Sequence, residues 1–122
     1  MKILVNTVQI IVALGLVNVW VLRFGRKTRY RGGSGENLPG EFAAYGLPGW
    51  FVWLVGTLKL SCAALFVAGL WLPGAVAPAA GVLIGLMLGA ILMHLKVRDP
   101  LVRSLPAALM LGMSVFLLWN AL

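Results

Sequence analysis

Three polar side chains lie inside stretches that are otherwise apolar, and they are the residues best suited to bind a small molecule. Lys59 stands nine positions after Trp50, about 13 Å along a helix that rises 1.5 Å per residue. A lysine at the middle of a membrane costs about 2.5–3.5 kcal/mol on insertion scales, so it is seldom found there without a role. Asn18 and His94 share a depth near the ends of the first and third stretches. Together they predict a polar vestibule for an anionic or carbonyl-bearing ligand, with a quinone as the candidate cofactor.

Each of these residues also has a purely structural interpretation. Lys59 would then extend its long stem toward the membrane surface or donate to a helix carbonyl. His94 would be a hydrogen-bonded group at the membrane interface. The acids that serve as counter-ions in either case are Glu36, Glu41 and Asp99. The sequence leaves both interpretations of Lys59 open.

Residue counts exclude several kinds of catalysis. The single cysteine, Cys62, rules out dithiol–disulfide exchange within the chain, and the single histidine cannot supply both axial ligands of a b-type haem. The three acids are scattered in loops, so we expect neither a metal site nor a catalytic triad. No residue is assigned a catalytic role, and a self-contained enzyme is not expected.

Membrane-spanning helices must position these residues. The chain has 122 residues, of which 61% are hydrophobic and 11% charged, and its mean hydropathy is +1.00. Soluble domains carry about 25% charged residues, and a helix needs about 20 apolar residues to cross the hydrocarbon layer. We therefore predict an all-α integral membrane four-helix bundle that forms one domain over residues 1–122. The predicted spans are residues 3–22, 50–72, 78–95 and 101–121.

Tryptophans and prolines mark the ends of these spans. Tryptophans favour the two membrane interfaces, and those that fit this belt are Trp20, Trp50, Trp53, Trp71 and Trp119. Asp99 and Pro100 resemble a helix N-cap followed by proline at the first helical position. Pro106 lies deeper and predicts a kinked or two-part start of the fourth span.

The basic residues predict an orientation. The net charge of +7 comes from 10 Lys and Arg against 3 Asp and Glu. Lys96, Arg98 and Arg103 lie between the third and fourth spans. The residues expected at the membrane surface after the first span are Arg23, Arg26, Lys27, Arg29 and Arg31. By the positive-inside rule both loops face the cytoplasm, which places both termini on the non-cytoplasmic side.

A bacterial-type plasma (inner) membrane is the expected location. Attraction to anionic lipid headgroups explains the basic loops, so the lipid bilayer is the expected partner and a nucleic acid is not.

Small residues recur at every fourth position on two spans. Gly81, Gly85 and Gly89 do so in the third span, and Ala108 and Gly112 in the fourth. Such stripes let helix backbones approach closely. They predict helix packing, either inside one bundle or along the seam of a homodimer.

The long polar loop between the first and second spans covers residues 23–49. Its glycine-rich segment, residues 32–35, is expected to be flexible and lacks the lysine of a phosphate-binding loop. Residues 39–45 predict a short helix with Phe42 and Tyr45 on one side and Glu41 outside. This helix would lie in the headgroup plane or fold back as a lid.

Several short motifs occur together between residues 40 and 120: Val55–Leu60, Ala68–Leu70, Met87–Ala90, Met93–Pro100 and the entry Glu41-Phe42 with Tyr45–Pro48. By these motifs, residues 40–120 resemble the DoxX-like family of small membrane proteins. The resemblance implies a four-helix bundle associated with redox systems, since members include a subunit of a thiosulfate–quinone oxidoreductase. More distant relatives act as chaperones or cargo receptors. Many members carry Glu where Lys59 stands, so a role that rests on an acid there does not carry over.

Two functions follow. The first is a non-catalytic membrane subunit or assembly partner of a larger redox or bioenergetic complex, with other membrane proteins or a second copy as partners. The alternative is a protein that binds a quinone-like or lipid-like molecule in a polar vestibule near Lys59. Transport is less favoured, because four spans without polar stripes leave little room for a pathway.

Overall fold

The computed structural model describes residues 1–26, 28 and 30–122, and within these residues it contains helices and no strand. The predicted all-α fold is therefore confirmed. The helices are α1 (Lys2–Val17), α2 (Leu38–Ala44), α3 (Gly49–Ala68), α4 (Val76–Lys96) and α5 (Leu105–Ala121). A π-helical turn (Asn18–Leu22) extends α1, and 3₁₀ turns (Pro73–Ala75 and Leu101–Ser104) precede α4 and α5.

Four of these helices are long and apolar enough to cross a membrane. With their adjoining turns they cover Lys2–Leu22, Gly49–Ala68, Pro73–Lys96 and Leu101–Ala121. The second ends at Ala68 rather than Leu72, because Gly69 and Pro73 favour a turn over continued helix. The chain is thus a multi-pass membrane protein with a long polar loop after its first span.

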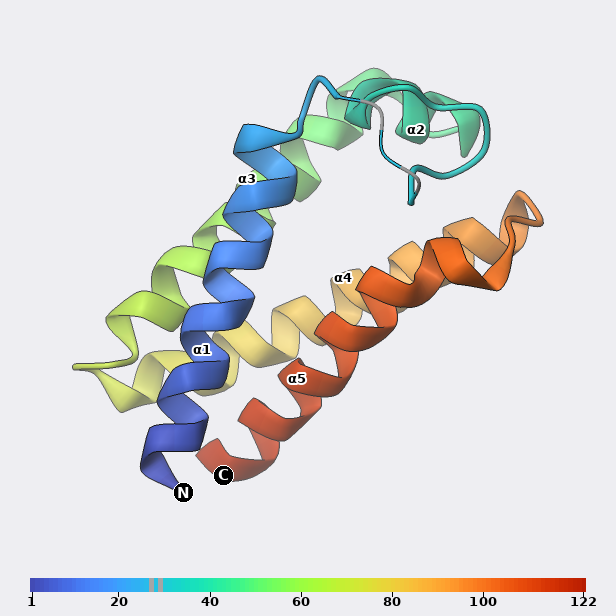
Figure 1. Ribbon diagram of the computed structural model, residues 1–122. Helices are drawn as coiled ribbons and strands as arrows, with labels where there is room; N and C mark the ends of the chain where they lie inside the picture. Colours follow the sequence, from blue (N-terminus) through green and yellow to red (C-terminus); the bar gives the residue numbers. More distant parts are fainter. Residues whose placement is uncertain (27, 29) are drawn as a thin grey trace.

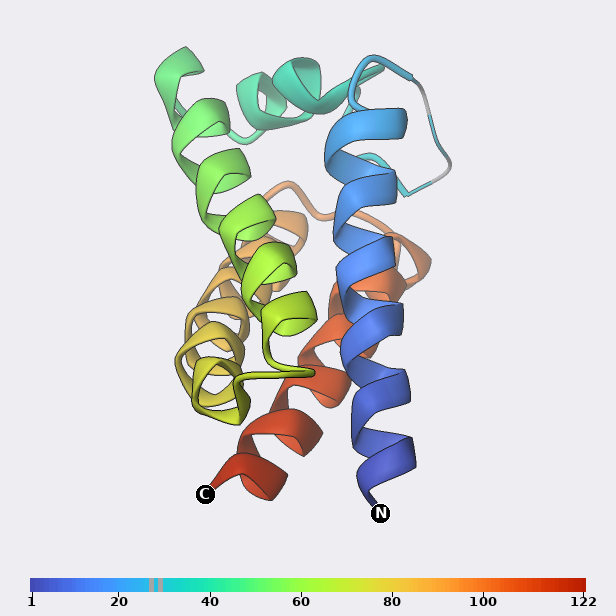
Figure 2. The same ribbon diagram turned by 90° about the vertical axis from the view of Figure 1, so that its left-hand side faces the viewer.

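The long helices form two pairs that diverge like the arms of a V. The helix α1 packs along α3, α4 packs along α5, and α3 also contacts α4. Figure 1 shows α1 and α5 close together near the two termini and far apart at the other end. Figure 2 shows α2 lying across that open end. Both termini therefore lie at the closed end, opposite the polar loop.

The larger apolar core lies toward the closed end of the V. Its fully buried members include Val12, Phe66, Leu83 and Leu117, one from each long helix. A second, more aromatic cluster lies near α2 and contains Trp20, Leu38, Phe42, Tyr45, Val52 and Val55. The short helix is therefore attached to the spans by apolar packing.

Polar side chains inside the spans find partners on helix carbonyls. The buried Gln9 of α1 donates from Nε2 to the Phe66 carbonyl oxygen of α3 over 3.0 Å. The hydroxyls of Thr57 and Ser114 each donate to a carbonyl one turn earlier. Such bonds remove most of the penalty for a polar group in lipid.

The tryptophans divide into two groups. The four that are exposed near helix ends, as the aromatic-belt pattern predicts, are Trp50, Trp53, Trp71 and Trp119. Trp20 is instead buried, and its ring packs on Gly56 of α3, where a Cβ would lie 2.9 Å from the ring. Trp20 therefore belongs to the protein interior.

The predicted small-residue stripes lie on open helix faces. A Cβ added at Gly81, Gly85, Gly89 or Gly112 would meet nothing within 4 Å among the described residues. Ala108 is exposed as well. An added Cβ would therefore touch no neighbouring helix at these glycines, and their role in helix packing, within the bundle or against a second copy, stays a prediction.

The start of the fourth span differs in part from expectation. A 3₁₀ turn precedes α5, whose first turn contains Pro106, so the predicted two-part start is confirmed. Asp99 makes no capping hydrogen bond to this turn. Its carboxylate accepts from the backbone amide of Gly33 instead, so the predicted N-cap is wrong.

Candidate functional site

A cavity of about 770 Å³ lies between the arms of the V. Its walls come from α1, α3, α4 and α5, and from residues 30–46, which we call the lid because they cover the open end. Asn18, Lys59 and His94 all line this cavity. Three helices thus bring the three predicted ligand-binding residues to one site.

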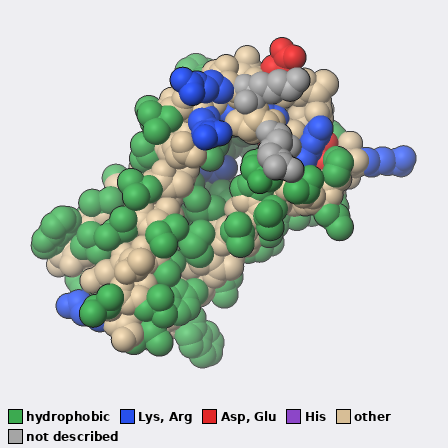
Figure 3. Space-filling view, in the orientation of Figure 1, with side chains coloured by type: hydrophobic (Ala, Val, Ile, Leu, Met, Phe, Trp, Pro, Cys, Tyr) green, Lys and Arg blue, Asp and Glu red, His purple; other side chains and the backbone are tan. Residues whose placement is uncertain are grey.

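The cavity is polar toward the lid and apolar away from it. Charged and hydroxyl-bearing lid residues form one end, and the opposite wall carries glycines and flexible apolar side chains: Gly15, Gly85, Leu86, Met110 and Met113. Figure 3 shows basic side chains gathered around the lid end and hydrophobic side chains covering the arms. Such a division suits a molecule with a polar head and an apolar body.

The ammonium group of Lys59 faces the ring of Trp20. Its Nζ lies 5.1 Å from the ring centroid. Among the described residues, this ammonium makes no hydrogen bond and no ion pair. A cation–π contact is worth about 0.5–2 kcal/mol, whereas a lysine at mid-membrane costs about 2.5–3.5 kcal/mol. The ring therefore offsets only part of the penalty for this charge.

Glu41 is buried in the cavity wall and joins two other lid residues. Its carboxylate accepts from Arg31 Nη1 over 3.1 Å and from the Tyr45 hydroxyl over 2.6 Å. The Nε2 atom of His94 lies 4.0 Å from Glu41 Oε1. The sequence predicts Glu41 on the outward-facing side of its short helix and Arg31 exposed at the membrane surface. Both expectations are wrong, because pairing the two charges allows them to be buried together.

A second ionic cluster attaches the lid to α4 and α5. Asp99 accepts from Arg103 Nη1 and from His94 Nδ1, each over 2.8 Å, and from the Gly33 amide. Burial opposes ionisation of Asp99, but these hydrogen bonds outweigh it and hold the pKa of Asp99 below its ordinary value. Asp99 therefore carries its charge at neutral pH.

The glycine-rich segment of the lid has fixed structural tasks. Gly33 adopts a φ of +54°, which an L side chain rarely adopts, and so directs its amide at Asp99. The Gly33 carbonyl accepts from Arg103 over 2.7 Å. Gly32 lies directly against the hydroxyl of Tyr45, where a side chain would collide. The segment was expected to be flexible, but these contacts indicate that Gly32 and Gly33 are held in place by Tyr45, Asp99 and Arg103.

The fold of α2 follows from its sequence. The Asn37 side chain caps the helix by accepting from the Gly40 amide over 2.7 Å, and Pro39 occupies the first turn. This start directs Glu41 inward. Tyr45 ends the helix, and Lys96 donates to the Tyr45 carbonyl over 2.8 Å.

The Tyr45 hydroxyl is held in its protonated form. Burial and the neighbouring Glu41 carboxylate raise the pKa of Tyr45 above its ordinary value. Its ring also meets that of His94 edge-on, with the centroids 5.8 Å apart. Tyr45 therefore acts as a hydrogen-bond donor to Glu41 and as a packing contact between the lid and α4.

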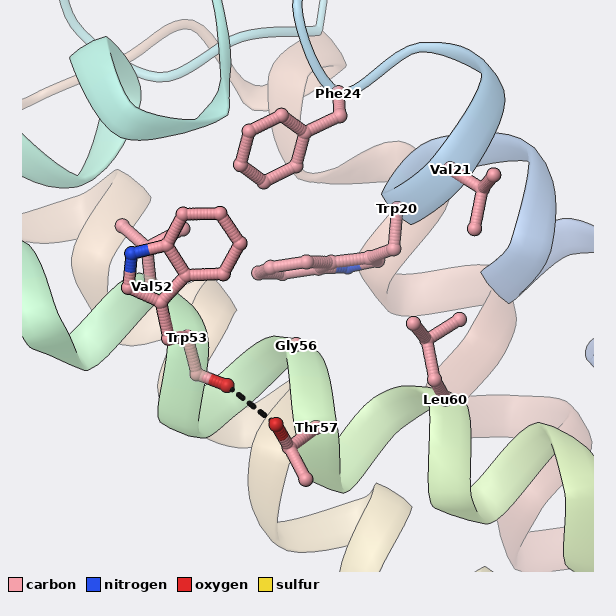
Figure 4. Close-up of a pocket in the computed structure, with 8 residues that line it drawn as sticks. All are labelled: Trp20, Val21, Phe24, Val52, Trp53, Gly56, Thr57 and Leu60. Atoms are coloured by element: carbon pink, nitrogen blue, oxygen red, sulfur yellow. Dashed lines mark hydrogen bonds between the residues drawn. The ribbon is translucent and has the colours of Figure 1, made fainter.

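A smaller cavity of about 350 Å³ lies on the other side of the Trp20 ring (Figure 4). Phe24 and Trp53 stack above it with centroids 5.6 Å apart, and the Thr57 hydroxyl is bonded to the Trp53 carbonyl. Trp20 lines both cavities. We assign no polar ligand to this outer cavity.

Sequence reasoning identified one part of the site and missed the other. Asn18, Lys59 and His94 were found as polar residues in apolar stretches. Glu41 and Asp99 were named with Glu36 as available counter-ions, because acids are scarce in this strongly basic chain, but their burial and their partners Arg31 and Arg103 were not predicted. Of the residues expected at the membrane surface, Arg23 and Arg26 are exposed. Lys27 and Arg29 lie outside the described residues.

Comparison with known proteins identifies one family. The sequence model of the DoxX-like family matches residues 7–117. This range contains the second and third spans and the lid completely, and most of the first and fourth spans. The same comparisons found no curated protein and no solved structure that matches the chain.

Proposed function

The chain belongs to the DoxX-like family of membrane proteins, and we propose that it binds an amphipathic, quinone-like or lipid-like molecule in the cavity beneath the lid. The observation that carries this proposal is the meeting of Asn18, Lys59 and His94 in one cavity. No catalytic residue and no metal are part of it.

The dimensions of the cavity support binding of a small molecule. Ligand pockets commonly measure about 300–1,000 Å³ and combine apolar walls with a few polar groups. The cavity of about 770 Å³ lies in this range, and polar groups such as Asn18, Lys59 and His94 stand among its apolar walls. A ligand head would therefore lie near Lys59 and His94, and its apolar part would lie along Gly85 and Met110.

Filling the apolar end of the cavity tests this proposal. Gly85 lines the cavity, and its Cβ position is open, so Gly85→Phe places a ring where the ligand would lie. Gly81, one turn earlier on α4, is equally open but does not line the cavity, so Gly81→Phe is the matched control. Both substitutions replace a helical glycine and alter helix propensity alike.

Two measurements follow on the purified full chain in mild detergent. Organic extracts are analysed by mass spectrometry for retained lipids and quinones, and tryptophan fluorescence is titrated with a quinone that carries a decyl tail. We expect retention or saturable quenching for the wild type and Gly81→Phe, and loss of both for Gly85→Phe. Equal binding by the two variants, or no binding by the wild type, would contradict the proposal.

The second candidate is a non-catalytic subunit or assembly partner of a redox or bioenergetic membrane complex. The open faces at Gly81 and Gly112 favour it, because exposed small residues let a second helix approach closely in lipid. The partner would be another membrane subunit or a second copy. Under this alternative, Gly81→Phe lowers the mass of the complex in gentle detergent, while Gly85→Phe has no special effect on ligand retention.

We further propose a plasma (inner) membrane of bacterial type, with the lid in the cytoplasm and both termini on the other side. The support is the concentration of Arg and Lys at the lid end, which the positive-inside rule assigns to the cytoplasm.

A further inference from the structure

The cavity contains cations that have no anionic partner. Of the basic residues that line it, Arg31 pairs with Glu41 and Arg103 pairs with Asp99. Lys59 and Arg23 also line the cavity, and within the described part of the chain neither has a carboxylate partner. The lining is therefore positively charged after the internal ion pairs are formed.

We propose that the ligand has an anionic head, which binds the Lys59 ammonium, and an apolar part that lies along the Gly85 and Met110 wall. This inference rests on the proposed function and names its ligand class. A neutral carbonyl would hydrogen-bond to Lys59 but would leave its charge uncompensated in apolar surroundings. An anion supplies the missing countercharge.

Within the described residues, the protein's own carboxylates form no hydrogen bond or ion pair with Lys59. Glu41 accepts from Arg31 and Tyr45, and Asp99 accepts from His94, Arg103 and the Gly33 amide. The Trp20 ring occupies one side of the ammonium. The cavity side of Lys59 is left for the ligand, and Arg23 lies at the exposed rim, where it attracts anions.

The chemistry fits two sources, a free fatty acid and the headgroup of an anionic phospholipid. The probe for the shared chemistry is a fluorescent fatty acid, 11-(dansylamino)undecanoic acid, and its methyl ester is the neutral counterpart. The full chain in neutral detergent is titrated with each probe. Competition with oleate and with dioleoylphosphatidylglycerol then separates the two sources.

Lys59→Met removes the charge and keeps an unbranched apolar stem, while Lys59→Arg keeps the charge. Lys2→Met, at the closed end of the V, is the control for loss of one positive charge. Removing a lysine from a span makes membrane insertion easier, so Lys59→Met is expected to fold.

We expect the wild type and Lys2→Met to bind the acid about 10- to 100-fold more tightly than the ester, as a charged hydrogen bond predicts. Lys59→Met should bind the acid only as tightly as the ester, and Lys59→Arg should restore most of the difference. Equal affinity of the wild type for acid and ester, or an unchanged preference in Lys59→Met, would overturn the inference. Tight binding of both probes would still support the proposed function, whereas binding of neither would contradict both proposals.

Discussion

Replacement of Glu41 by leucine should release the lid without unfolding the spans. The Glu41 carboxylate accepts from Arg31 Nη1 over 3.1 Å and from the Tyr45 hydroxyl over 2.6 Å. The side chains of Arg31 and Glu41 are only 5% and 11% exposed, so water screens their interaction little. Leucine has a similar size but accepts no hydrogen bond, and it leaves the Arg31 charge buried without its carboxylate.

The expected loss of lid stability depends on the hydrogen bonds that Arg31 retains in Glu41→Leu. Loss of one partner from a buried ion pair costs about 3–5 kcal/mol. Arg31 still donates to the carbonyl oxygens of Arg23 and Arg26, which favours the lower limit. A loss of about 3 kcal/mol raises the population of the open lid about 100-fold.

Hydrogen–deuterium exchange of the detergent-solubilised chain measures how often the lid opens, and it does so separately for each segment of the chain. Amides of α2 and of Tyr45, which follows it, should exchange about 100-fold faster in Glu41→Leu, while amides of α3 and α4 should be unchanged. The double variant Arg31→Met with Glu41→Leu should recover part of this loss, because no charge is left buried without a partner. It still lacks the Tyr45 hydrogen bond to Glu41 and the Arg31 bonds to the Arg23 and Arg26 carbonyls. Glu36→Leu, at an exposed acid with no ion pair among the described residues, is the control.

Three results would refute this reasoning. An increase of less than about threefold in α2 exchange would mean that the pair contributes under 1 kcal/mol. Equal acceleration in α3 and α4 would mean that Glu41 holds the whole bundle rather than the lid. A double variant as unstable as Glu41→Leu would show that the buried charge of Arg31 is not the source of the loss.

Two further predictions concern the lid and the core. Because the pKa of Asp99 is depressed in the folded state, ionised Asp99 stabilises the folded lid at pH values above the ordinary carboxyl pKa of about 4, and this contribution is lost as the pH falls through the folded-state pKa. Asp99→Asn should therefore raise hydrogen exchange of the lid at pH 7 and flatten the dependence of that exchange on acid pH. A variant with the wild-type pH profile would contradict this. In the core, a Cβ at Gly69 would lie 2.6 Å from Val76 Cγ2 and 3.0 Å from Gln9 Nε2, so Gly69→Ala should destabilise the protein by about 1–3 kcal/mol in thermal unfolding. Gly81→Ala, where nothing lies within 4 Å, should leave stability unchanged or raise it by up to about 1 kcal/mol, and equal effects of the two substitutions would rule out the steric explanation.

The helices were predictable because each depends on local sequence. A run of about 20 apolar residues is a sufficient signal for a span, and Pro73, Pro100 and Pro106 restrict where helices begin and end. Lys59 was recognisable for the same reason, since a charge inside an apolar run is conspicuous without any structure.

The lid was not predictable because it depends on contacts between distant parts of the chain. Gly33 and Asp99 are 66 positions apart, and Arg103 reaches Gly33 across 70. Nothing local to Glu41 indicates that it faces Arg31 rather than water. The amphipathic pattern of a helix as short as α2 specifies its buried side only weakly, and the Asn37 cap and the Arg31 charge decide it.

For the small-residue stripes, by contrast, the local pattern is clear but the surface that it contacts is not specified. Spacing of four residues correctly identifies one face of a helix, but it does not say what lies against that face. Packing inside the bundle was the simpler expectation, yet Gly81 and Gly112 lie on open surfaces and Gly85 lies at the cavity. A stripe of this kind permits close approach without specifying a partner.

Lid closure and ligand binding share residues, so they cannot be independent. Glu41 and Tyr45 hold the lid in place and also line the cavity, and His94 does the same from α4. A ligand that binds only beneath a closed lid must stabilise that lid by RT ln(1 + [L]/Kd), and lid contacts must strengthen binding by the same coupling energy. Loss of ligand in Glu41→Leu would therefore not assign Glu41 to a direct ligand contact. Lys59 makes no hydrogen bond or ion pair to the described lid residues, so a change of ligand preference in Lys59→Met with unchanged lid exchange separates head recognition from closure.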